Sequence, residues 1–228
     1  MKKYDIFLFD ADSTLYDYYK AESYALRTVF KNCGFEYSGR ILRKYRKINS
    51  KAWADFECGR ISKEDLQHIR FARLFDEIGI SHDAVDFNKR YLVELGRGAF
   101  LIDGAKEICE AVTSAGKQIF IVTNGILATQ QSRIKHSIIK NYISDYFVSE
   151  FVGHQKPKRE YFDYVFAHIP QTPKDKILII GDSLLADIAG GNAAGIDSCW
   201  FNEHSKENET DIIPTYEINK LNELQKFI

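Results

Sequence analysis

The sequence contains few of the residues that break a chain into separate modules. It has only four prolines in 228 residues and no run rich in glycine and serine, which excludes a long flexible linker. It also lacks an internal repeat and a low-complexity tract. Any domain boundary must therefore be a short hinge, and the length allows one large domain with a second, smaller one.

Cysteines are also few, and they lie far apart. They show neither the close pairs of zinc sites nor the density of a disulfide-stapled secreted domain; the four positions are Cys33, Cys58, Cys109 and Cys199. We expect reduced thiols, most of them buried, because free cysteine is among the most buried residue types. The six histidines are scattered without the spacing of metal ligands, and we expect His154 on the surface.

An excess of charge of one sign and a long apolar run are missing too. The formal net charge is -1, with 45% hydrophobic and 28% charged residues, so the composition gives no reason to expect a nucleic-acid polymer or a membrane as partner. The apolar stretch near the N-terminus is interrupted by Asp5 and Asp10, which fits neither a signal peptide nor a membrane span. We expect a cytoplasmic protein.

What the chain does contain is a regular alternation of two patterns. After Asp103, which we expect to cap a helix, apolar β-rich runs alternate with helical stretches. Strands of this kind form a parallel sheet covered by helices on both faces, so the pattern predicts an α/β fold. The expected helices are Gly104–Ala115, Thr129–Ile139, Arg159–Ile169 and Leu185–Ala194, and the expected strands are Tyr4–Phe9, Gln118–Val122, Tyr146–Ser149, Lys176–Ile180 and Asp197–Phe201.

The segment from about residue 18 to residue 98 has a helical pattern throughout. Its expected helices are Glu22–Lys31, Arg40–Phe56, Lys63–Glu77 and Ala84–Leu95, with breaks at Gly34, Gly59 and Gly79. Because the strand before this segment belongs with the later strands, the segment is an insertion after the first strand. We expect a core of residues 1–14 and 99–228 and a helical domain of residues 15–98.

Polar side chains follow four of the expected strands. In a parallel sheet of this type, ligands bind beyond the carboxyl ends of the strands. Taken alone, each of these residues could equally belong to a polar turn or a solvated surface. Their joint occurrence at four strand ends predicts one site. In chain order they are Asp10 and Asp12, Thr123 and Asn124, Lys156, and Asp182 and Asp187.

These residue types indicate a division of labour. On an extended path the spacing of Asp10 and Asp12 sends both carboxylates to one side, so one can attack while the other handles protons. The hydroxyl and amide after the second strand can donate hydrogen bonds to an anionic oxygen. Lys156 can neutralise a phosphate or the carboxylates, and the pair Asp182 and Asp187 is suited to hold a hard divalent cation.

This ordered set of motifs resembles the haloacid dehalogenase superfamily. The phosphatase members are the better match, since dehalogenases proper lack an acid at the position of Asp12. The resemblance covers essentially the whole chain and implies a doubly wound, Rossmann-like core with the helical block as an inserted cap. Further stretches are similar to the bacterial pyrimidine 5'-nucleotidase branch, namely Ile48–Trp53 with Gly59, Cys199–Asn202 and Ile213–Ile218.

The resemblance also implies a role for each site residue. Asp10 is the expected nucleophile, which forms an aspartyl-phosphate, and Asp12 the acid and base that protonates the leaving alcohol and then activates water. Ser13 stands where related phosphatases often have glycine or an acid; on an extended path it points away from both carboxylates, so we expect little effect. The remaining roles are phosphate binding by Thr123, Asn124 and Lys156, and magnesium binding by Asp10, Asp12 (through its backbone carbonyl), Asp182 and, in support, Asp187.

The function implied is that of a magnesium-dependent phosphomonoester hydrolase, a monomer or small homo-oligomer acting on small phosphate esters. The narrower resemblance implies pyrimidine nucleoside monophosphates such as UMP, dUMP, dTMP and non-canonical analogues. A sugar-phosphate or phosphoglycolate phosphatase stays open, because selectivity lies mainly in the cap. So does a phospho-accepting regulatory module, although it would need neither Asp12 nor a cap. Cap residues able to contact a base are Tyr45, Asn49, Trp53 and Phe56, but aromatics at helical spacing are more often core.

Overall fold

The computed structural model describes residues 2–228, except for the side chain of Glu57. The chain divides into two compact units: the segment up to Tyr18 together with Ala99–Ile228, and Tyr19–Gly98. We call them the α/β unit and the helical unit. The sequence predicts that the helical domain begins at Leu15, but the helical unit begins later. Leu15 is buried in the core of the α/β unit, and its carbonyl accepts a hydrogen bond of 3.0 Å from the N–H of Ile102.

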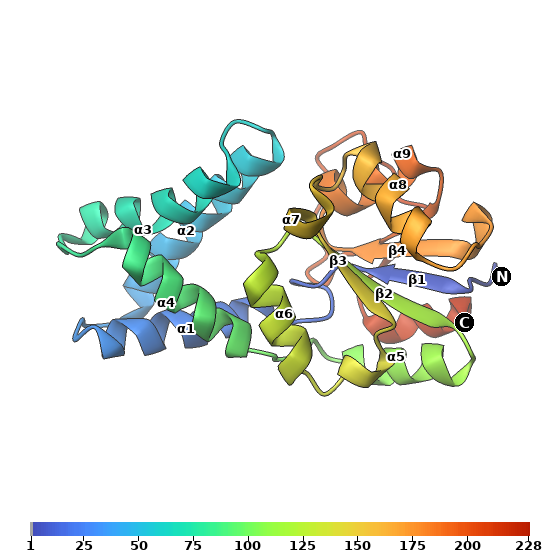
Figure 1. The fold of residues 1–228 in the computed structure, drawn as a ribbon, viewed down its shortest axis with the longest axis horizontal. Helices are drawn as coiled ribbons and strands as arrows, with labels where there is room; N and C mark the ends of the chain where they lie inside the picture. Colours follow the sequence, from blue (N-terminus) through green and yellow to red (C-terminus); the bar gives the residue numbers. More distant parts are fainter. Residues whose placement is uncertain (1) are drawn as a thin grey trace. The chain divides into compact units, whose positions relative to one another are not determined.

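The α/β unit is built on a six-stranded sheet in the order β3-β2-β1-β4-β5-β6 (Figure 1). All neighbouring strands are parallel. β1 lies inside the sheet, so that Leu8 is opposite Phe120 on one side and Ile179 on the other. The strands are β1 Ile6–Phe9, β2 Gln118–Thr123, β3 Asp145–Val148, β4 Ile177–Gly181, β5 Asp197–Phe201 and β6 Tyr216–Ile218.

Helices cover both faces of this sheet (Figure 1). Successive side chains of a strand point to opposite faces, and in β1 both faces are buried. Phe7 and Phe9 belong to the apolar cluster formed with α5 (Ala105–Ser114) and the 3₁₀ helix η4 (Leu221–Phe227). Ile6 and Leu8 belong to the cluster on the other face, formed with α8 (Arg159–His168) and α9 (Ala189–Ala194). The continuous apolar run of β1 reflects this double burial.

Several elements of the α/β unit differ from the expectation. Asp103 is not a helix cap: α5 begins after Gly104, which has a φ of 84° and no side-chain cap bond. The expected helix from Leu185 starts as a π-helical turn, η3, before α9. The short strand β6, η4 and the four-residue helix α7 were not foreseen. The remaining elements are α6 Leu127–His136, η1 Lys140–Tyr142, α7 Ser149–Val152, η2 Lys174–Lys176 and η3 Leu184–Ile188.

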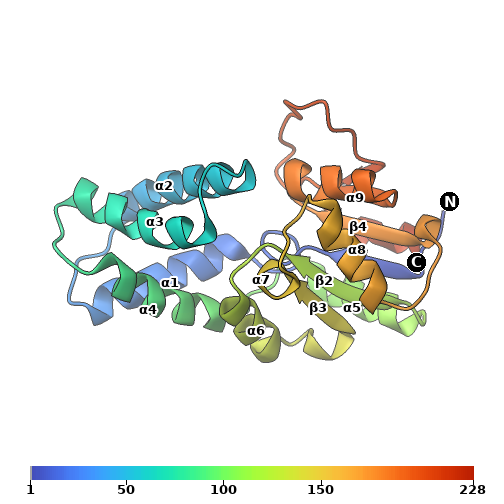
Figure 2. The ribbon, with the colours of Figure 1, turned by 45° about the horizontal axis from the view of Figure 1, so that its top comes forward.

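The helical unit has its own aromatic core. Its helices are α1 Tyr18–Asn32, α2 Gly39–Glu57, α3 Lys63–Ile78 and α4 Ala84–Arg97, and α3 packs against both α2 and α4 (Figure 2). Tyr45 is fully buried and stacks on Phe71 with ring centroids 5.1 Å apart. The side-chain amide oxygen of Asn49 accepts a hydrogen bond of 3.1 Å from the guanidinium of buried Arg70. Of the candidate base contacts, Tyr45, Asn49 and Phe56 are therefore interior residues, whereas Trp53 is half-buried.

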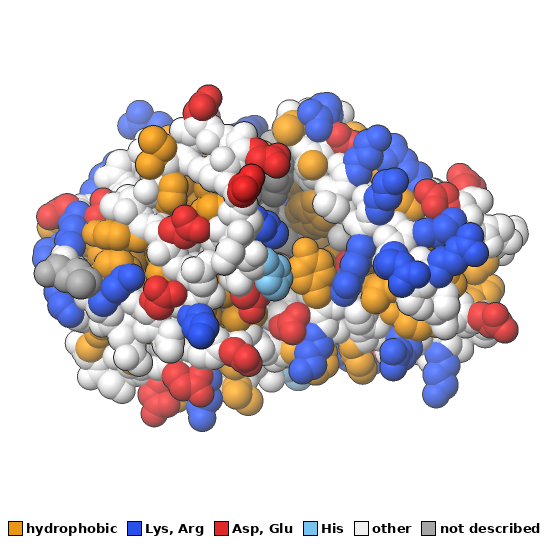
Figure 3. Space-filling model, turned by 180° about the vertical axis from the view of Figure 1, so that it is seen from behind, with side chains coloured by type: hydrophobic (Ala, Val, Ile, Leu, Met, Phe, Trp, Pro, Cys, Tyr) orange, Lys and Arg blue, Asp and Glu red, His pale blue; other side chains and the backbone are white. Residues whose placement is uncertain are grey.

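Charge is distributed unevenly over the two units. Lys and Arg outnumber Asp and Glu in residues 19–98, and the reverse holds in the rest of the chain. In Figure 3 blue side chains accordingly dominate the helical unit, on the right, whereas most red ones lie over the α/β unit. The net charge near zero is thus a sum of two opposite values, which composition alone does not reveal.

Two further expectations concern the surface. The four cysteines are free, but only Cys109 and Cys199 are buried; Cys33 is half-buried and Cys58 exposed. The expectation of mostly buried thiols is therefore wrong for half of them. His154 is exposed, as expected. In the described part of the chain, residues 2–228, no helix combines the length and the apolar character that crossing a membrane requires.

Candidate active site

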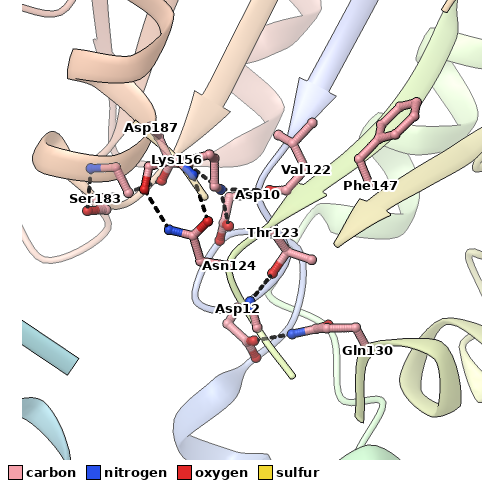
Figure 4. Close-up of polar contacts among 12 residues, drawn as sticks. Asp10, Asp12, Val122, Thr123, Asn124, Gln130, Phe147, Lys156, Ser183 and Asp187 are labelled. Atoms are coloured by element: carbon pink, nitrogen blue, oxygen red, sulfur yellow. Dashed lines mark hydrogen bonds and ion pairs between the residues drawn. The ribbon is translucent and has the colours of Figure 1, made fainter. Parts of the chain in front are cut away.

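The predicted site residues converge at the carboxyl ends of β1, β2 and β4 (Figure 4). Asp10 directly follows β1, and its N–H donates a hydrogen bond of 2.8 Å to the carbonyl of Ile180, which extends the pairing with β4. Thr123 ends β2 and Gly181 ends β4. Because these strands are parallel neighbours, residues more than 100 positions apart in the sequence meet at one edge.

Lys156 lies at the centre of this group. Its ammonium nitrogen Nζ is 2.7 Å from Asp10 Oδ1, 2.6 Å from Asp187 Oδ1 and 2.6 Å from the carbonyl oxygen of Val122. Only 1% of its side chain is exposed. The three donors of the ammonium group are thus matched by three acceptors, which is how a buried lysine is tolerated.

Three carboxylates surround the lysine. Asp10, Asp182 and Asp187 each bring an oxygen to within 4.8 Å of the others. Both oxygens of Asp187 already accept hydrogen bonds, one from Lys156 and one, at 3.2 Å, from the N–H of Ser183. A Cβ atom at Gly181 would lie 2.1 Å from Asp187 Oδ2, so glycine is required for the close approach of this carboxylate.

The charges of the group are not balanced. Burial raises the pKa of Asp10 to about 7, assisted by the charge of Asp187 and opposed by Lys156. Burial alone would lower the pKa of Lys156, but the carboxylates of Asp10 and Asp187 outweigh it and raise that pKa. Although its side chain as a whole is exposed, the carboxyl group of Asp182 is crowded by protein atoms, and this desolvation and the same two charges raise its pKa.

This excess of negative charge fits a hard divalent cation. Oxygen ligands from carboxylates are the donors that magnesium and calcium prefer, and a cation there would offset the repulsion that raises these pKa values. Asp182 is also held in place, because its backbone carbonyl accepts a hydrogen bond of 3.0 Å from the indole of Trp200. Asp10 and Asp182 are therefore placed to ligate a cation, with Asp187 orienting Lys156 beside them.

Thr123, which ends β2, and Asn124, which follows it, have different environments. The hydroxyl oxygen of Thr123 accepts a hydrogen bond of 3.0 Å from the N–H of Gly125, which leaves its own hydrogen to be donated. The amide of Asn124 donates to the carbonyl of Lys156 and accepts from the N–H of Lys156, both at 2.9 Å. Asn124 therefore anchors the backbone of the lysine, a role that its sequence position did not suggest.

Asp12 departs from the expected geometry. The chain does not continue extended after Asp10 but turns, with the N–H groups of Leu15 and Tyr16 both bonded to the carbonyl of Ala11. Ser13 has a φ of 63°, in the left-handed region that favours glycine. The expectation of an extended path through Ser13 is therefore wrong, and this position needs an unusual backbone conformation.

The Asp12 carboxylate is held by two residues that the sequence did not single out. It accepts hydrogen bonds from Gln130 Nε2 and Arg133 Nη1, both on α6. In the sequence, Arg133 is one of three basic residues near the end of a helix, where a solvated cation interacting with the helix dipole is the usual interpretation. Nothing local indicates that its side chain is 0% exposed.

The comparisons with known proteins agree with this geometry. Residues 4–195 match the family model of haloacid dehalogenase-like hydrolases. The chain belongs to this family. YfnB of Bacillus subtilis strain 168, named as a HAD-hydrolase, is 42% identical over 226 residues, covering 98% of this chain and 95% of YfnB. A crystal structure of YfnB bound to magnesium matches 99% of this chain and 98% of its own with a TM-score of 0.93 and 41% identity.

Two further relatives of this HAD-like hydrolase carry names that state an activity. The pyrimidine 5'-nucleotidase PynA of Streptococcus pneumoniae R6 is 36% identical, over 97% of this chain and 93% of PynA. The pyrimidine 5'-nucleotidase YjjG of Escherichia coli K12 is 29% identical, over 99% of this chain and 98% of YjjG. The expected family, its hydrolase class and the HAD-like α/β core are confirmed.

Proposed function

We propose that this HAD-like hydrolase is a magnesium-dependent phosphomonoesterase that works through an aspartyl-phosphate on Asp10. The observation that carries the proposal is the Asp10 carboxylate, which Lys156 holds at 2.7 Å at the end of β1, beside the carboxylates of Asp182 and Asp187. A carboxylate fixed in this way is oriented for attack before the substrate arrives.

In the first step an oxygen of Asp10 attacks phosphorus, and the bond between phosphorus and the ester oxygen breaks. Asp12 gives its proton to that oxygen, so the leaving group departs as an alcohol. In the second step the Asp12 carboxylate takes a proton from water, whose oxygen attacks the phosphoryl group and frees Asp10 together with inorganic phosphate. Asp12 lies two residues from Asp10, on the turn that follows β1, and so serves as acid and then as base.

The remaining residues hold the anion and the cation. The hydroxyl of Thr123 contacts the phosphate, Lys156 places its positive charge beside it, and Asn124 acts through the backbone of Lys156. Asp10, Asp182 and the backbone carbonyl of Asp12 would hold magnesium, with Asp187 in support. When bound, the ion offsets the negative charges of the carboxylate and the phosphate, which must approach each other.

We infer that the substrates are pyrimidine nucleoside 5'-monophosphates and that the helical unit, residues 19–98, is the cap that selects them. Two relatives named as pyrimidine 5'-nucleotidases, PynA and YjjG, support this at 36% and 29% identity over nearly the whole chain. The core chemistry is common to many phosphate esters, so the substrate class must be tested separately from the mechanism.

The test is a panel of phosphate esters assayed with and without magnesium. It contains UMP, dUMP, dTMP, purine monophosphates, phosphoglycolate and sugar phosphates. We expect turnover only with magnesium and highest kcat/KM for the pyrimidine esters. A preference for sugar phosphates would refute the nucleotidase assignment and leave the mechanism intact.

The covalent step has its own test. We expect Asp10→Asn to lose at least about 1,000-fold in kcat, since a nucleophile cannot be replaced by its amide. The control is Asp103→Asn, at an exposed aspartate outside the site. Rapid quenching of the wild type should add the mass of one phosphoryl group to the peptide with Asp10. Near-normal turnover by Asp10→Asn would refute the mechanism.

A further inference from the structure

Gln130 and Arg133 lie three residues apart on α6, a spacing that puts both side chains on one face of a helix. Both reach the carboxylate of Asp12, but each reaches a different oxygen. Arg133 Nη1 donates to Oδ1, and Gln130 Nε2 donates to Oδ2, as Figure 4 shows for Gln130. The carboxylate therefore cannot rotate about its own bond without losing at least one of these partners.

The two donors and the acceptor differ in burial. Gln130 is 1% exposed and the Arg133 side chain 0%, whereas 29% of the Asp12 side chain is exposed. Buried side chains have few alternative rotamers, so the donors form a fixed frame. The exposed part of Asp12 is left open for a reacting group.

Tyr16 ties the turn that carries Asp12 to the same frame. The guanidinium carbon of Arg133 lies 5.5 Å from the centroid of the Tyr16 ring, a distance typical of a cation–π contact. The carbonyl of Tyr16 accepts a hydrogen bond of 2.8 Å from the N–H of Ser13. The backbone next to Asp12 and the guanidinium that holds its side chain thus depend on one buried residue.

Gly125 gives an independent indication that the path of Gln130 matters. A Cβ atom at this position would lie 2.3 Å from Gln130 Nε2, closer than side-chain atoms approach one another. Gly125 lies two residues after Thr123, which ends β2, and its N–H donates a hydrogen bond to the Thr123 hydroxyl oxygen. The loop is therefore shaped to let the Gln130 amide pass through to Asp12.

We propose that Gln130 and Arg133 are positioning residues, which hold the Asp12 carboxyl group in the orientation for proton transfer to the leaving oxygen and from the attacking water. This inference rests on the proposed function of Asp12. Neither residue reacts; each acts through Asp12. A role in folding alone would instead make their contribution independent of Asp12 and of the leaving group.

The test compares two esters that differ in their need for a proton. The alcohol of an alkyl ester such as UMP leaves only when protonated, whereas the nitrophenolate of p-nitrophenyl phosphate leaves without a proton. We expect Gln130→Met to lower the rate of the first step with UMP, measured as uridine release in a single turnover, by about 10-fold to 100-fold, since a misplacement of about 1 Å can cost on the order of 100-fold. We expect little change in the single-turnover release of nitrophenolate, and no loss with either ester for the control Gln131→Met, at an exposed neighbour. Hydrolysis of the aspartyl-phosphate, which needs Asp12 as base with both esters, does not enter this first-step rate.

A double-mutant cycle gives the second readout. In an Asp12→Asn background, which we expect to lose about 100-fold to 10,000-fold on UMP, Gln130→Met should cause no further loss, because the group that it positions is gone. Arg133→Lys should retain more UMP turnover than Arg133→Met, since lysine keeps a charged donor. If the Arg133 variants do not fold by circular dichroism, the Gln130→Met cycle decides the question by itself.

These outcomes distinguish the positioning role of Gln130 and Arg133 from the proposed role of Asp12. Equal losses in the first-step rates of both esters, or an undiminished loss in the Asp12→Asn background, would overturn the positioning role while leaving the proposed function standing. If Asp12→Asn itself lowers the first-step rates of both esters equally, Asp12 is not the proton donor, and the proposed role of Asp12 and this inference fail together.

Discussion

Replacing Lys156 by methionine tests whether this lysine is the charge that makes the carboxylate group stable. The substitution keeps the length of the apolar stem but removes the ammonium group. Asp10 and Asp187, both buried, lose their contacts of 2.7 and 2.6 Å to Nζ, and the Val122 carbonyl loses its contact of 2.6 Å. The carboxylates then repel each other without a compensating charge.

The expected cost follows from these three contacts. Removing one partner of a buried ion pair costs about 3–5 kcal/mol, and an unsatisfied buried carbonyl costs about 1–3 kcal/mol. These costs overlap because the carboxylates can take up protons or water. We therefore expect the free energy of unfolding in EDTA to fall by about 3–5 kcal/mol.

The cost should depend on pH in a defined direction. The pKa of Asp10 is already raised to about 7, and without Lys156 it rises further. A carboxyl group whose folded pKa lies above its unfolded pKa keeps its stability at low pH and loses it as the pH rises towards the folded pKa. The destabilisation by Lys156→Met should therefore be small near about pH 5 and largest near about pH 8.

Urea unfolding followed by tryptophan fluorescence can isolate the unit concerned. The chain has two tryptophans, Trp53 in the helical unit and Trp200 in the α/β unit. In a Trp53→Phe background the fluorescence of Trp200 reports the unit that contains Lys156. The control is Lys158→Met, at an exposed lysine two residues away. A loss below about 1 kcal/mol at alkaline pH, similar to that of an ordinary surface substitution, would refute the reasoning.

Two further predictions concern packing and thiol reactivity. Gly181→Ala should destabilise the α/β unit by about 1–3 kcal/mol in urea unfolding, because the new Cβ would lie 2.1 Å from Asp187; an unchanged midpoint would contradict the tight packing. With a thiol reagent at about pH 8, exposed Cys58 should react first, whereas Cys109 and Cys199, whose pKa burial raises to about 12, should react only after unfolding. Modification of all four thiols in the folded protein would contradict this burial.

Much of the fold could be predicted because its signals are local. The apolar run that ends at Phe9 and the alternating segments after Asp103 predict a parallel sheet, and β5 begins and ends where expected, at Asp197 and Phe201. Helix limits were predicted less well where tertiary contacts decide them. The segment from Leu184 adopts a π-helical turn, and Leu15 joins the α/β core through a bond to Ile102, which no periodicity indicates.

The candidate site could also be predicted only in part from the sequence. The residue types that end β1, β2 and β4 are visible in the sequence, since each strand end contains a polar residue behind an apolar run. The environments of these residues are not. The sequence places Asp182 at the end of a buried strand but does not show that its side chain as a whole is exposed. Asn124 is predicted to bind an anion, but it binds the backbone of Lys156.

The amino-acid sequence by itself therefore determined the family, the parallel α/β core and the set of carboxylates, hydroxyl and lysine that the core assembles, because these follow from patterns a few residues long. Only the tertiary structure decided how the charges are paired. Asp12 is held by Gln130 and Arg133, which lie 118 and 121 residues away. The Arg133 side chain is 0% exposed because of partners that lie far away in the sequence. No local pattern shows whether an arginine has such partners or is solvated.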